Sequence, residues 1–502
     1  MADEAPEVRR INWSECLGWT RLFRAFEVAV QPGQLFLAFV TVFCVLVGGW
    51  LLDTVWPTDS GIQVIEERGR AVYTELNAYV DAGYNAEVGD ALFQQRSREA
   101  QGSVARHGPF SVLQRFARDV VNEATSAVFA FRLLDDDAGR PGLIHCIVKV
   151  PAAFAWLLLS HLWYALLFSL WTLAMLSVFG GATYRVAALY ATRGEMLGLT
   201  DAMKFARERA WQFFLSPLLP LVLAVIGVVA LTIGGFLARW PVLDVLAGLI
   251  WFIPLIVALG VCVVLVLAVA ALPMMHPTIA VEGTDAFDAF ARPIGYVFER
   301  RWRTPFYYLV SLIYGLICLR VVKFVLAMAF WFVHWAVGLG MNRFAAAPAE
   351  GQPPIGKLHT LWKAPAADTS IWGAFPSGDL GWLETATSNL IWLWVGLFVL
   401  MLAAFGFSLF CASSSMIYLM LRREVDGIDH EEVWTEEAEQ AWMRATDASA
   451  ASTTGSAGLT SLTVSADRGA SSGAGTAGGA SRAYEEALRE AVGESPRSES
   501  EH

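Results

Sequence analysis

The segment GTDAFDAFARPIGYVFERRW occupies residues 283–302 and lies between two long apolar runs. It carries too many charges to join either run, at about 246–272 before it and about 306–340 after it. Each run exceeds the roughly 20 apolar residues that a helix needs to cross a bilayer. The order of span, charged aromatic segment and span predicts that the chain turns back at a membrane surface here.

The composition of the whole chain agrees with this reading. Of its 502 residues, 56% are hydrophobic and only 17% are charged, whereas soluble domains average about 45–50% and about 25%. The sequence therefore predicts an all-α, polytopic helical membrane bundle with about six transmembrane helices and cytoplasmic interfacial amphipathic helices. The six apolar runs cover about 34–52, 152–179, 214–238, 246–272, 306–340 and 387–421.

Basic residues indicate the orientation of these spans. They cluster before the first run, between the second and third, between the fourth and fifth, and after the sixth. The positive-inside rule places all four regions in the cytoplasm. We therefore expect cytoplasmic N- and C-termini in a multi-pass protein. Because the first apolar run follows a charged stretch and no convincing cleavage site is present, we expect a retained signal anchor.

The same pattern divides the chain into regions. Residues 422–502 hold 7 Arg and 16 Asp or Glu, so their balance of −9 accounts for most of the net charge of −11. Their centre is rich in Ser, Gly, Ala and Thr, which predicts disorder. The expected regions are a cytoplasmic amphipathic segment (1–33), a first transmembrane helix (34–52), an extracytoplasmic helical insertion (53–150), a five-span membrane domain (151–421) and an acidic, largely disordered cytoplasmic tail (422–502).

Three segments read as amphipathic helices that each precede a span on the cytoplasmic side. At 100° per residue, residues 284–303 separate into an aromatic side and a charged side, and 17–30 and 200–213 do so too. Such helices suit the lipid headgroup boundary, where arginine heads reach water. The candidate membrane-interface residues are Trp19, Arg21, Arg24, Arg207, Trp211, Arg292, Arg300, Arg301 and Trp302.

Two of these segments also share short sequence motifs. The motifs TDA, FAR and ERxW occur in the same order in 200–211 and in 284–302. Either the chain holds an imperfect internal repeat, or the likeness reflects a background rich in Phe, Arg and Trp.

A family resemblance follows from the second segment. A span, then PTIAVEGTDAFDAFARPIGYVFERRWRTPFYYLV (277–310), then another span resembles YciC-like bacterial multipass inner-membrane proteins. It also resembles the membrane domain attached to some glycerophosphodiester phosphodiesterases, over roughly 180–310. The catalytic barrel of those phosphodiesterases has no counterpart here. The resemblance implies an architecture and a bacterial inner membrane, and it implies no activity.

Motifs for chemistry are missing from the sequence. It contains no zinc-protease, nucleotide-binding or nucleophile-elbow motif and no Cys/His metal cluster, so no cofactor or metal is expected. Arg320 and Lys323 interrupt the fifth apolar run. Charged residues within a span are costly and often functional, so this pair either forms an internal polar site or snorkels to the outer interface.

Three functions remain open from the sequence. The leading hypothesis is a non-enzymatic scaffold, assembly or envelope-organising protein. The alternative is a transporter or channel for lipid-like or amphiphilic solutes, with Arg320 or Lys323 in a polar cavity. The third is a lipid enzyme, which would need His276, Glu282 and Asp285 together in a groove. The expected partners are the lipid bilayer and a membrane or cytosolic protein, with no nucleic acid and an open oligomeric state.

Overall fold

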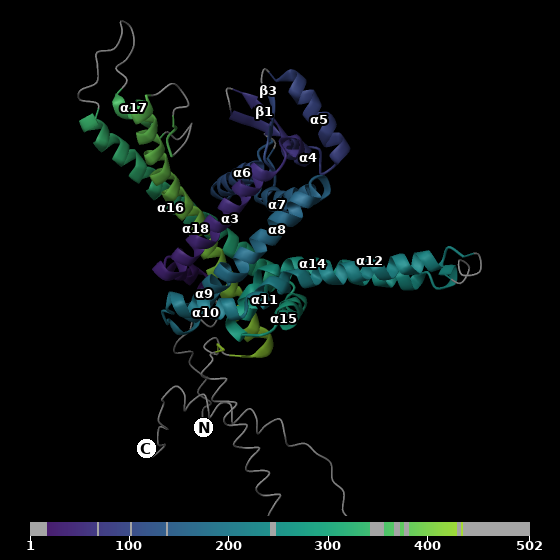
Figure 1. Ribbon diagram of the computed structural model, residues 1–502. Helices are drawn as coiled ribbons and strands as arrows, with labels where there is room; N and C mark the ends of the chain where they lie inside the picture. The colour runs from purple at the N-terminus through teal and green to yellow at the C-terminus, as the bar shows by residue number, and fades with distance from the viewer. Residues whose placement is uncertain are drawn as a thin grey trace, which may run out of the picture.

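Long apolar helices dominate the structure (Figure 1). The computed structural model describes residues 18–67, 70–100, 103–136, 139–240, 247–341, 356–365, 372–375, 381–428 and 433–434. Within them, seven helical stretches are long and apolar enough to cross a membrane. This is the architecture of a multi-pass helical membrane protein. The predicted tail, apart from 422–428 and 433–434, lies outside the described residues.

Two of the seven stretches are built from consecutive helices that continue through a short π or 3₁₀ segment, and the other five are single helices. The seven stretches are α3 (Pro32–Val55), α7 (Leu143–Ser160), α8 (Leu162–Met175) with η3 (Leu176–Gly180) and α9 (Gly181–Arg193), α11 (Ala210–Leu215) with η4 (Ser216–Leu218) and α12 (Leu219–Leu237), α14 (Phe252–Glu282), α16 (Arg303–Met341) and α18 (Trp382–Asp426).

The structure has one candidate transmembrane helix more than the six that the sequence predicts, and the difference arises at the second predicted span. The sequence places one span at 152–179, but the helix breaks at His161, whose φ of −135° and ψ of 52° are not helical. The apolar stretch also starts earlier, at Leu143, so α7 alone has 18 residues. A hydropathy run shows total length but not a change of direction, so the break was not visible in it.

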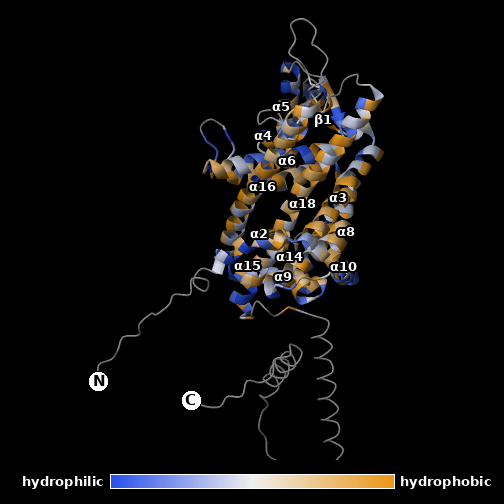
Figure 2. Cartoon of the chain, turned by 90° about the vertical axis from the view of Figure 1, so that its left-hand side faces the viewer, coloured by the Kyte–Doolittle hydropathy of each residue, from blue (hydrophilic) through white to orange (hydrophobic). Residues whose placement is uncertain are grey.

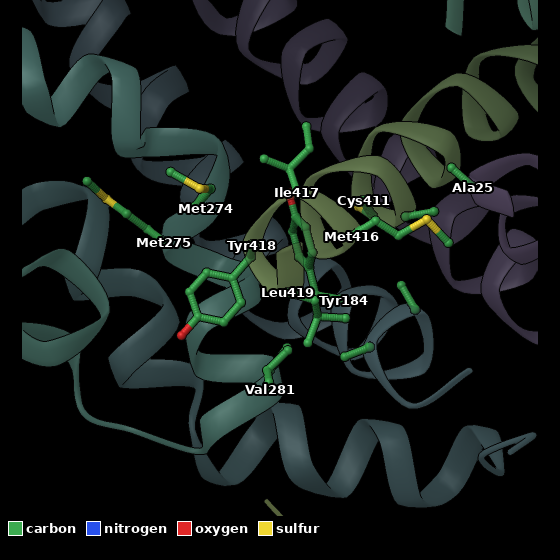
Figure 3. Packing of buried hydrophobic residues seen from close by; sticks show 14 of the residues in the cluster. Ala25, Tyr184, Met274, Met275, Val281, Cys411, Met416, Ile417, Tyr418 and Leu419 are labelled. Atoms are coloured by element: carbon green, nitrogen blue, oxygen red, sulfur yellow. The ribbon is translucent and has the colours of Figure 1, made fainter. Parts of the chain in front are cut away.

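One end of the molecule is a densely packed base. We use this name for η1 (Gly18–Arg24), α2 (Ala25–Ala29), α9, α10 (Leu199–Glu208), α11, α15 (Ala286–Glu299) and the adjoining ends of α14, α16 and α18. Figure 3 shows part of its core, where Tyr418 of α18 lies near Met274, Met275 and Val281 of α14. Tyr418 and Met274 have no exposed surface. The sequence predicts surface helices here, and the structure buries their inner sides instead.

Small and polar residues bring the base helices into contact. Gln34 of α3 donates to the Ser408 carbonyl (3.1 Å), and the Ser408 hydroxyl donates to the Ala29 carbonyl (2.8 Å). A Cβ at Gly181 would lie only 2.9 Å from the Phe213 ring. These contacts join the start of α3 to α18 and α9 to α11.

The opposite end of the molecule is formed by residues 58–136, here called the insertion. The sequence predicts it to be helical, and this is wrong in one respect because it contains a three-stranded antiparallel sheet of order β2-β1-β3. Ile62 and Val64 of β1 are fully buried, and this alternation was too short to outweigh the helical pattern around it. Its elements are η2 (Thr58–Ser60), β1 (Ile62–Glu67), β2 (Arg70–Thr74), α4 (Glu75–Asp81), α5 (Ala86–Glu99), β3 (Ser103–His107) and α6 (Pro109–Phe129).

The Asp53 carboxylate joins the insertion to α3. It accepts the backbone N–H groups of Phe110 and Ser111 (both 3.0 Å) at the start of α6, and the hydroxyl of Tyr164 (2.7 Å). A carboxylate at a helix N-terminus pairs with N–H groups that have no partner within the helix. A Cβ at Gly108 would collide with Asp53, so glycine permits this approach. Thus one side chain holds α3, α6 and α8 together.

Two helical hairpins extend from the base. Figure 1 shows α12 and α14 projecting to one side, and α16 and α18 projecting in another direction. α12 and α14 meet at Gly227, where a Cβ would lie 2.6 Å from the Val261 side chain. Large apolar side chains such as Val228 and Val266 are more than 60% exposed along them. Figure 2 shows apolar helices between the polar insertion and the polar base. This belt requires an apolar environment.

The Asp53 junction generates the first prediction. Asp53→Ala leaves two N–H groups and the Tyr164 hydroxyl without their acceptor, so we expect the free energy of unfolding to fall by about 2 kcal/mol. Thermal unfolding in detergent micelles measures this loss. Asp90→Ala, at an exposed position of α5, is the matched control and should change stability by less than about 0.5 kcal/mol. Equal melting temperatures for the two variants would contradict this role for Asp53.

Candidate functional site

The strongest cluster of charged side chains lies inside the base, around Glu282 at the end of α14. The Glu282 side chain is only 7% exposed. It forms ion pairs with Arg422 of α18 (Nε to Oε1, 3.2 Å) and with Arg292 of α15. It also accepts the Tyr418 hydroxyl (2.5 Å). One buried carboxylate therefore holds α14, α15 and α18 together.

The local sequence explains why these helices meet there. Gly283 ends α14 in the left-handed region, at φ 63°. Asp285 then caps α15 by accepting the N–H of Asp288 (2.9 Å). The turn between the helices is thus three residues long, which brings Arg292 back over Glu282. Burial opposes the charge of Arg292, but Glu282 and Asp288 outweigh it and raise the pKa of Arg292.

A second set of contacts fixes the end of α18. Glu424 accepts the Tyr307 hydroxyl (2.5 Å) and pairs with Arg303 (2.8 Å), and Arg300 donates to the Glu424 carbonyl (2.7 Å). Tyr296 donates to the Asp426 carboxylate. Burial and this hydrogen bond to Asp426 raise the pKa of Tyr296. The acidic end of α18 is therefore docked on α15 and on the start of α16.

A third set of contacts surrounds Trp434. The Arg185 guanidinium lies 4.4 Å from the Phe205 ring centre, and the Arg209 guanidinium lies 4.4 Å from the Trp434 ring centre. Arg185 donates to the carbonyls of Ala280 (2.6 Å) and Trp434 (2.7 Å). We call the side chains of Arg185, Phe205 and Arg209, with the Ala280–Gly283 backbone, the Trp434 cage.

The contacts around Trp434 also provide hydrogen-bond donors for the carbonyl groups at the end of α14. The last carbonyls of a helix lack partners within it. Here Ala280 accepts Arg185, Val281 accepts the Trp434 N–H (2.9 Å) and Gly283 accepts Arg209. The cage is therefore also a C-terminal cap of α14.

The charged side chains of the base position its helices through ion pairs and hydrogen bonds. Within the described ranges, no group of three or more His, Cys, Asp or Glu residues could hold a metal ion. His276, Glu282 and Asp285 each have separate partners: His276 contacts the Phe213 carbonyl (3.0 Å), Glu282 lies in the cluster above, and Asp285 caps α15. The structure does not bring these three together as the lipid-enzyme hypothesis requires.

The predicted interface residues near the N-terminus and α10 lie around the base. Trp19 is half-buried, with its ring edge-on to Phe306 (6.3 Å). Arg24 pairs with Glu27 at 3.8 Å on the surface, and Arg21 is half-buried. Arg207 is exposed, and Trp211 is 66% exposed.

The predicted residues of 284–303 divide into two groups. Arg292 and Arg300 take part in the base contacts described above. Arg301 is exposed, and Trp302 is 83% exposed. The base covers part of the side of α15 that the sequence assigns to lipid, because Phe290 and Val297 are buried there. Phe287 and Phe298 stay more than 60% exposed, as does Trp302.

Arg320 and Lys323 lie on α16, where it crosses α6 of the insertion. Lys323 donates to the Asn122 side chain of α6 (2.8 Å) and lies 6.0 Å from the Trp372 ring centre. Arg320 is exposed. Among the parts of the chain that the structure describes, neither residue forms an ion pair with an acidic side chain. Lys323 thus contacts the insertion.

Comparisons with protein-family models, curated proteins and solved structures found no match for this chain.

Sequence reasoning missed the residues at the centre of the base. Glu282 and Arg422 stand at the ends of apolar runs, where charges are ordinary, and Tyr418 lies within one. Trp434 lies 249 positions after Arg185, its bonding partner. One usable signal was Arg185 itself, a single charge in GGATYRVAALY (180–190) directly after an apolar run. A charged residue in a stretch of small and apolar residues suggests a buried partner.

The Glu282 cluster generates the second prediction. Glu282→Ala leaves two guanidinium groups and a tyrosine hydroxyl without their shared acceptor inside the base. We expect a loss of about 3–5 kcal/mol in the free energy of unfolding, as for a broken buried ion pair. Thermal unfolding in detergent measures it, with Glu299→Ala, at an exposed position of α15, as the control. A melting temperature equal to that of the control would refute the central role of Glu282.

Proposed function

We propose that this protein is a non-enzymatic scaffold of a bacterial inner membrane, which holds an outer insertion and a cytoplasmic base at fixed positions. One observation supports it most: α3 is bonded at both ends. Gln34 is tied to Ser408 in the base, and Asp53 is tied to the start of α6 in the insertion. The insertion and the base, which are both polar at the surface, are thereby connected through the apolar helices between them. The YciC-like resemblance of residues 180–310 agrees with this compartment.

The path of the described chain agrees with the six crossings that the sequence predicts. It begins at η1 and reaches the end of α18 in the same base, where the Tyr314 hydroxyl donates to the Phe23 carbonyl (2.9 Å). Both ends on one side require an even number of crossings. We infer that α7 does not cross, because it packs along the insertion: Lys149 bonds Glu123 of α6 (2.7 Å), and Trp156 contacts Tyr79 of α4.

Basic residues and exposed aromatics favour a cytoplasmic base. Arg207 and Arg301 are exposed on it, as are Trp211 and Trp302. Arginine and tryptophan are the residues that anchor proteins at the membrane surface, and arginine favours the cytoplasmic side. In this orientation the insertion faces outward, and both termini lie in the cytoplasm. The lipid bilayer is then the environment of the apolar belt.

The third prediction tests this topology. Arg239→Cys, at the tip of the α12–α14 hairpin, should react with a membrane-impermeant maleimide in intact cells, in a background whose native cysteines are replaced by alanine. Lys204→Cys, on α10 in the base, should react only after the membrane is permeabilised. Labelling of residue 204 in intact cells would invert the orientation. An unreactive residue 239 that labels after detergent extraction would show that the hairpin does not cross.

The fourth prediction tests the scaffold role. A photoreactive benzoylphenylalanine in place of Val88, which is 52% exposed on α5, should crosslink to another envelope protein in living cells. The same group in place of Val266, which is 70% exposed on α14, should mark lipid. Absence of protein adducts at both Val88 and Val104, another exposed insertion position, would argue against a scaffold. If the purified protein carries solute across the membrane of proteoliposomes and Lys323→Gln abolishes this flux, the result would favour a transporter instead.

A further inference from the structure

The segment Val433–Trp434 lies on the base although it belongs to the acidic tail. Val433 is only 5% exposed. Both backbone groups of Trp434 are paired, since its N–H donates to the Val281 carbonyl (2.9 Å) and its carbonyl accepts Arg185 (2.7 Å). Arg193 donates to the Val433 carbonyl (3.4 Å). Main-chain hydrogen bonds of this kind give affinity in several modes by which proteins recognise short peptides.

The indole ring of Trp434 fits between particular neighbours. The Phe205 ring lies 5.8 Å from it, and the Arg209 guanidinium lies 4.4 Å from its centre. A cation over an aromatic face is attracted by the ring quadrupole, and tryptophan gives the strongest attraction. On another side Gly283 approaches so closely that a Cβ there would lie 2.7 Å from the ring. The cage therefore selects a flat aromatic side chain.

The charge of the tail sequence around Trp434 is opposite to that of the cage. The sequence on either side of the pair reads DHEEVWTEEAEQ (429–440), which holds six acidic residues and no Lys or Arg. The cage side is basic, with Arg185 and Arg209 at the ring and Arg193 at Val433. Opposite charges steer such a segment to its site and discriminate against neutral peptides. Arginine is also the residue that binds acidic motifs in other proteins.

From these contacts we propose that the Trp434 cage is a recognition site for a short aliphatic–tryptophan pair in an acidic segment. The chain's own tail fills the site in cis through Val433 and Trp434. Within the described part of the tail, these two residues make the contacts with the cage. The partner class that this site fits is an acidic peptide with the same aliphatic–tryptophan pair. This site does not depend on the scaffold role, because it would bind the tail in a transporter as well.

The first test asks what Trp434 touches in the full-length protein. Azidophenylalanine replaces Trp434, and membrane vesicles with the cytoplasmic side outward are irradiated. We expect an adduct of monomer mass, mapped by mass spectrometry to 181–209 or 275–283. Adding a peptide of residues 429–440 in excess should reduce this adduct several-fold. Adducts of dimer mass would replace the cis contact with one between two copies, and adducts outside both ranges would overturn the proposal.

The second test measures how strongly the tail is held. A glutamate-specific protease, added to the same vesicles, should cut near Glu432 and Glu436 at least several-fold faster in Trp434→Ala than in wild type. Trp442→Ala is the matched control, since it removes a tryptophan eight positions later in the same tail. Arg209→Gln should also speed cleavage, whereas Arg207→Gln, two positions away on the exposed side of α10, should not.

The outcomes of the second test separate recognition from general attraction. Higher salt should speed cleavage of the wild type, because it screens the attraction between an acidic segment and the cage arginines. Equal cleavage rates for Trp434→Ala and Trp442→Ala would refute the site. So would an Arg207→Gln effect as large as that of Arg209→Gln, because any basic surface would then hold the tail equally well.

Discussion

The carboxylate of Glu282 is the interaction on which the base depends. It stands at the last position of α14, where the negative end of the helix dipole disfavours a second negative charge. Burial adds to this cost, since a buried charge without partners is strongly unfavourable. Arg292 and Arg422 offset both effects, and each comes from a different helix. The charge therefore can be buried only when α14, α15 and α18 are assembled together.

This requirement extends to the neighbouring turn. Ala280, Val281 and Gly283 offer carbonyls that the end of α14 leaves unpaired, and they are satisfied by α9, by Arg209 and by the tail. Three parts of the chain thus converge on four residues. The Glu282 side chain bonds Tyr418 and Arg422 of α18, while the carbonyls of the turn form part of the Trp434 cage. A change in the backbone of this turn would therefore alter both the Glu282 ion pairs and the hydrogen bonds of the Trp434 cage.

The sequence predicts most of the long apolar helices and few of the contacts inside the base. Hydrophobic runs are long and unambiguous, so α3, α14, α16 and α18 follow from composition alone. The sheet of the insertion was missed because β1 offers only a short alternation around Ile62 and Val64. The Glu282 and Trp434 contacts were missed for a different reason: their partners come from separate helices and from the tail, and a single sequence does not reveal such pairing.

The great length of α16 has a mechanical consequence. Its 39 residues span about 58 Å at 1.5 Å per residue, roughly twice the hydrocarbon thickness of a bilayer. At its far end, Phe330 packs with Trp362 and His334 bonds the Trp362 carbonyl (3.0 Å). Its near end is held through Arg303 and Tyr307. Phe330 lies about 40 Å along the helix from Arg303, so tilting α16 at the base by a single degree would move the Phe330–Trp362 contact by about 0.7 Å.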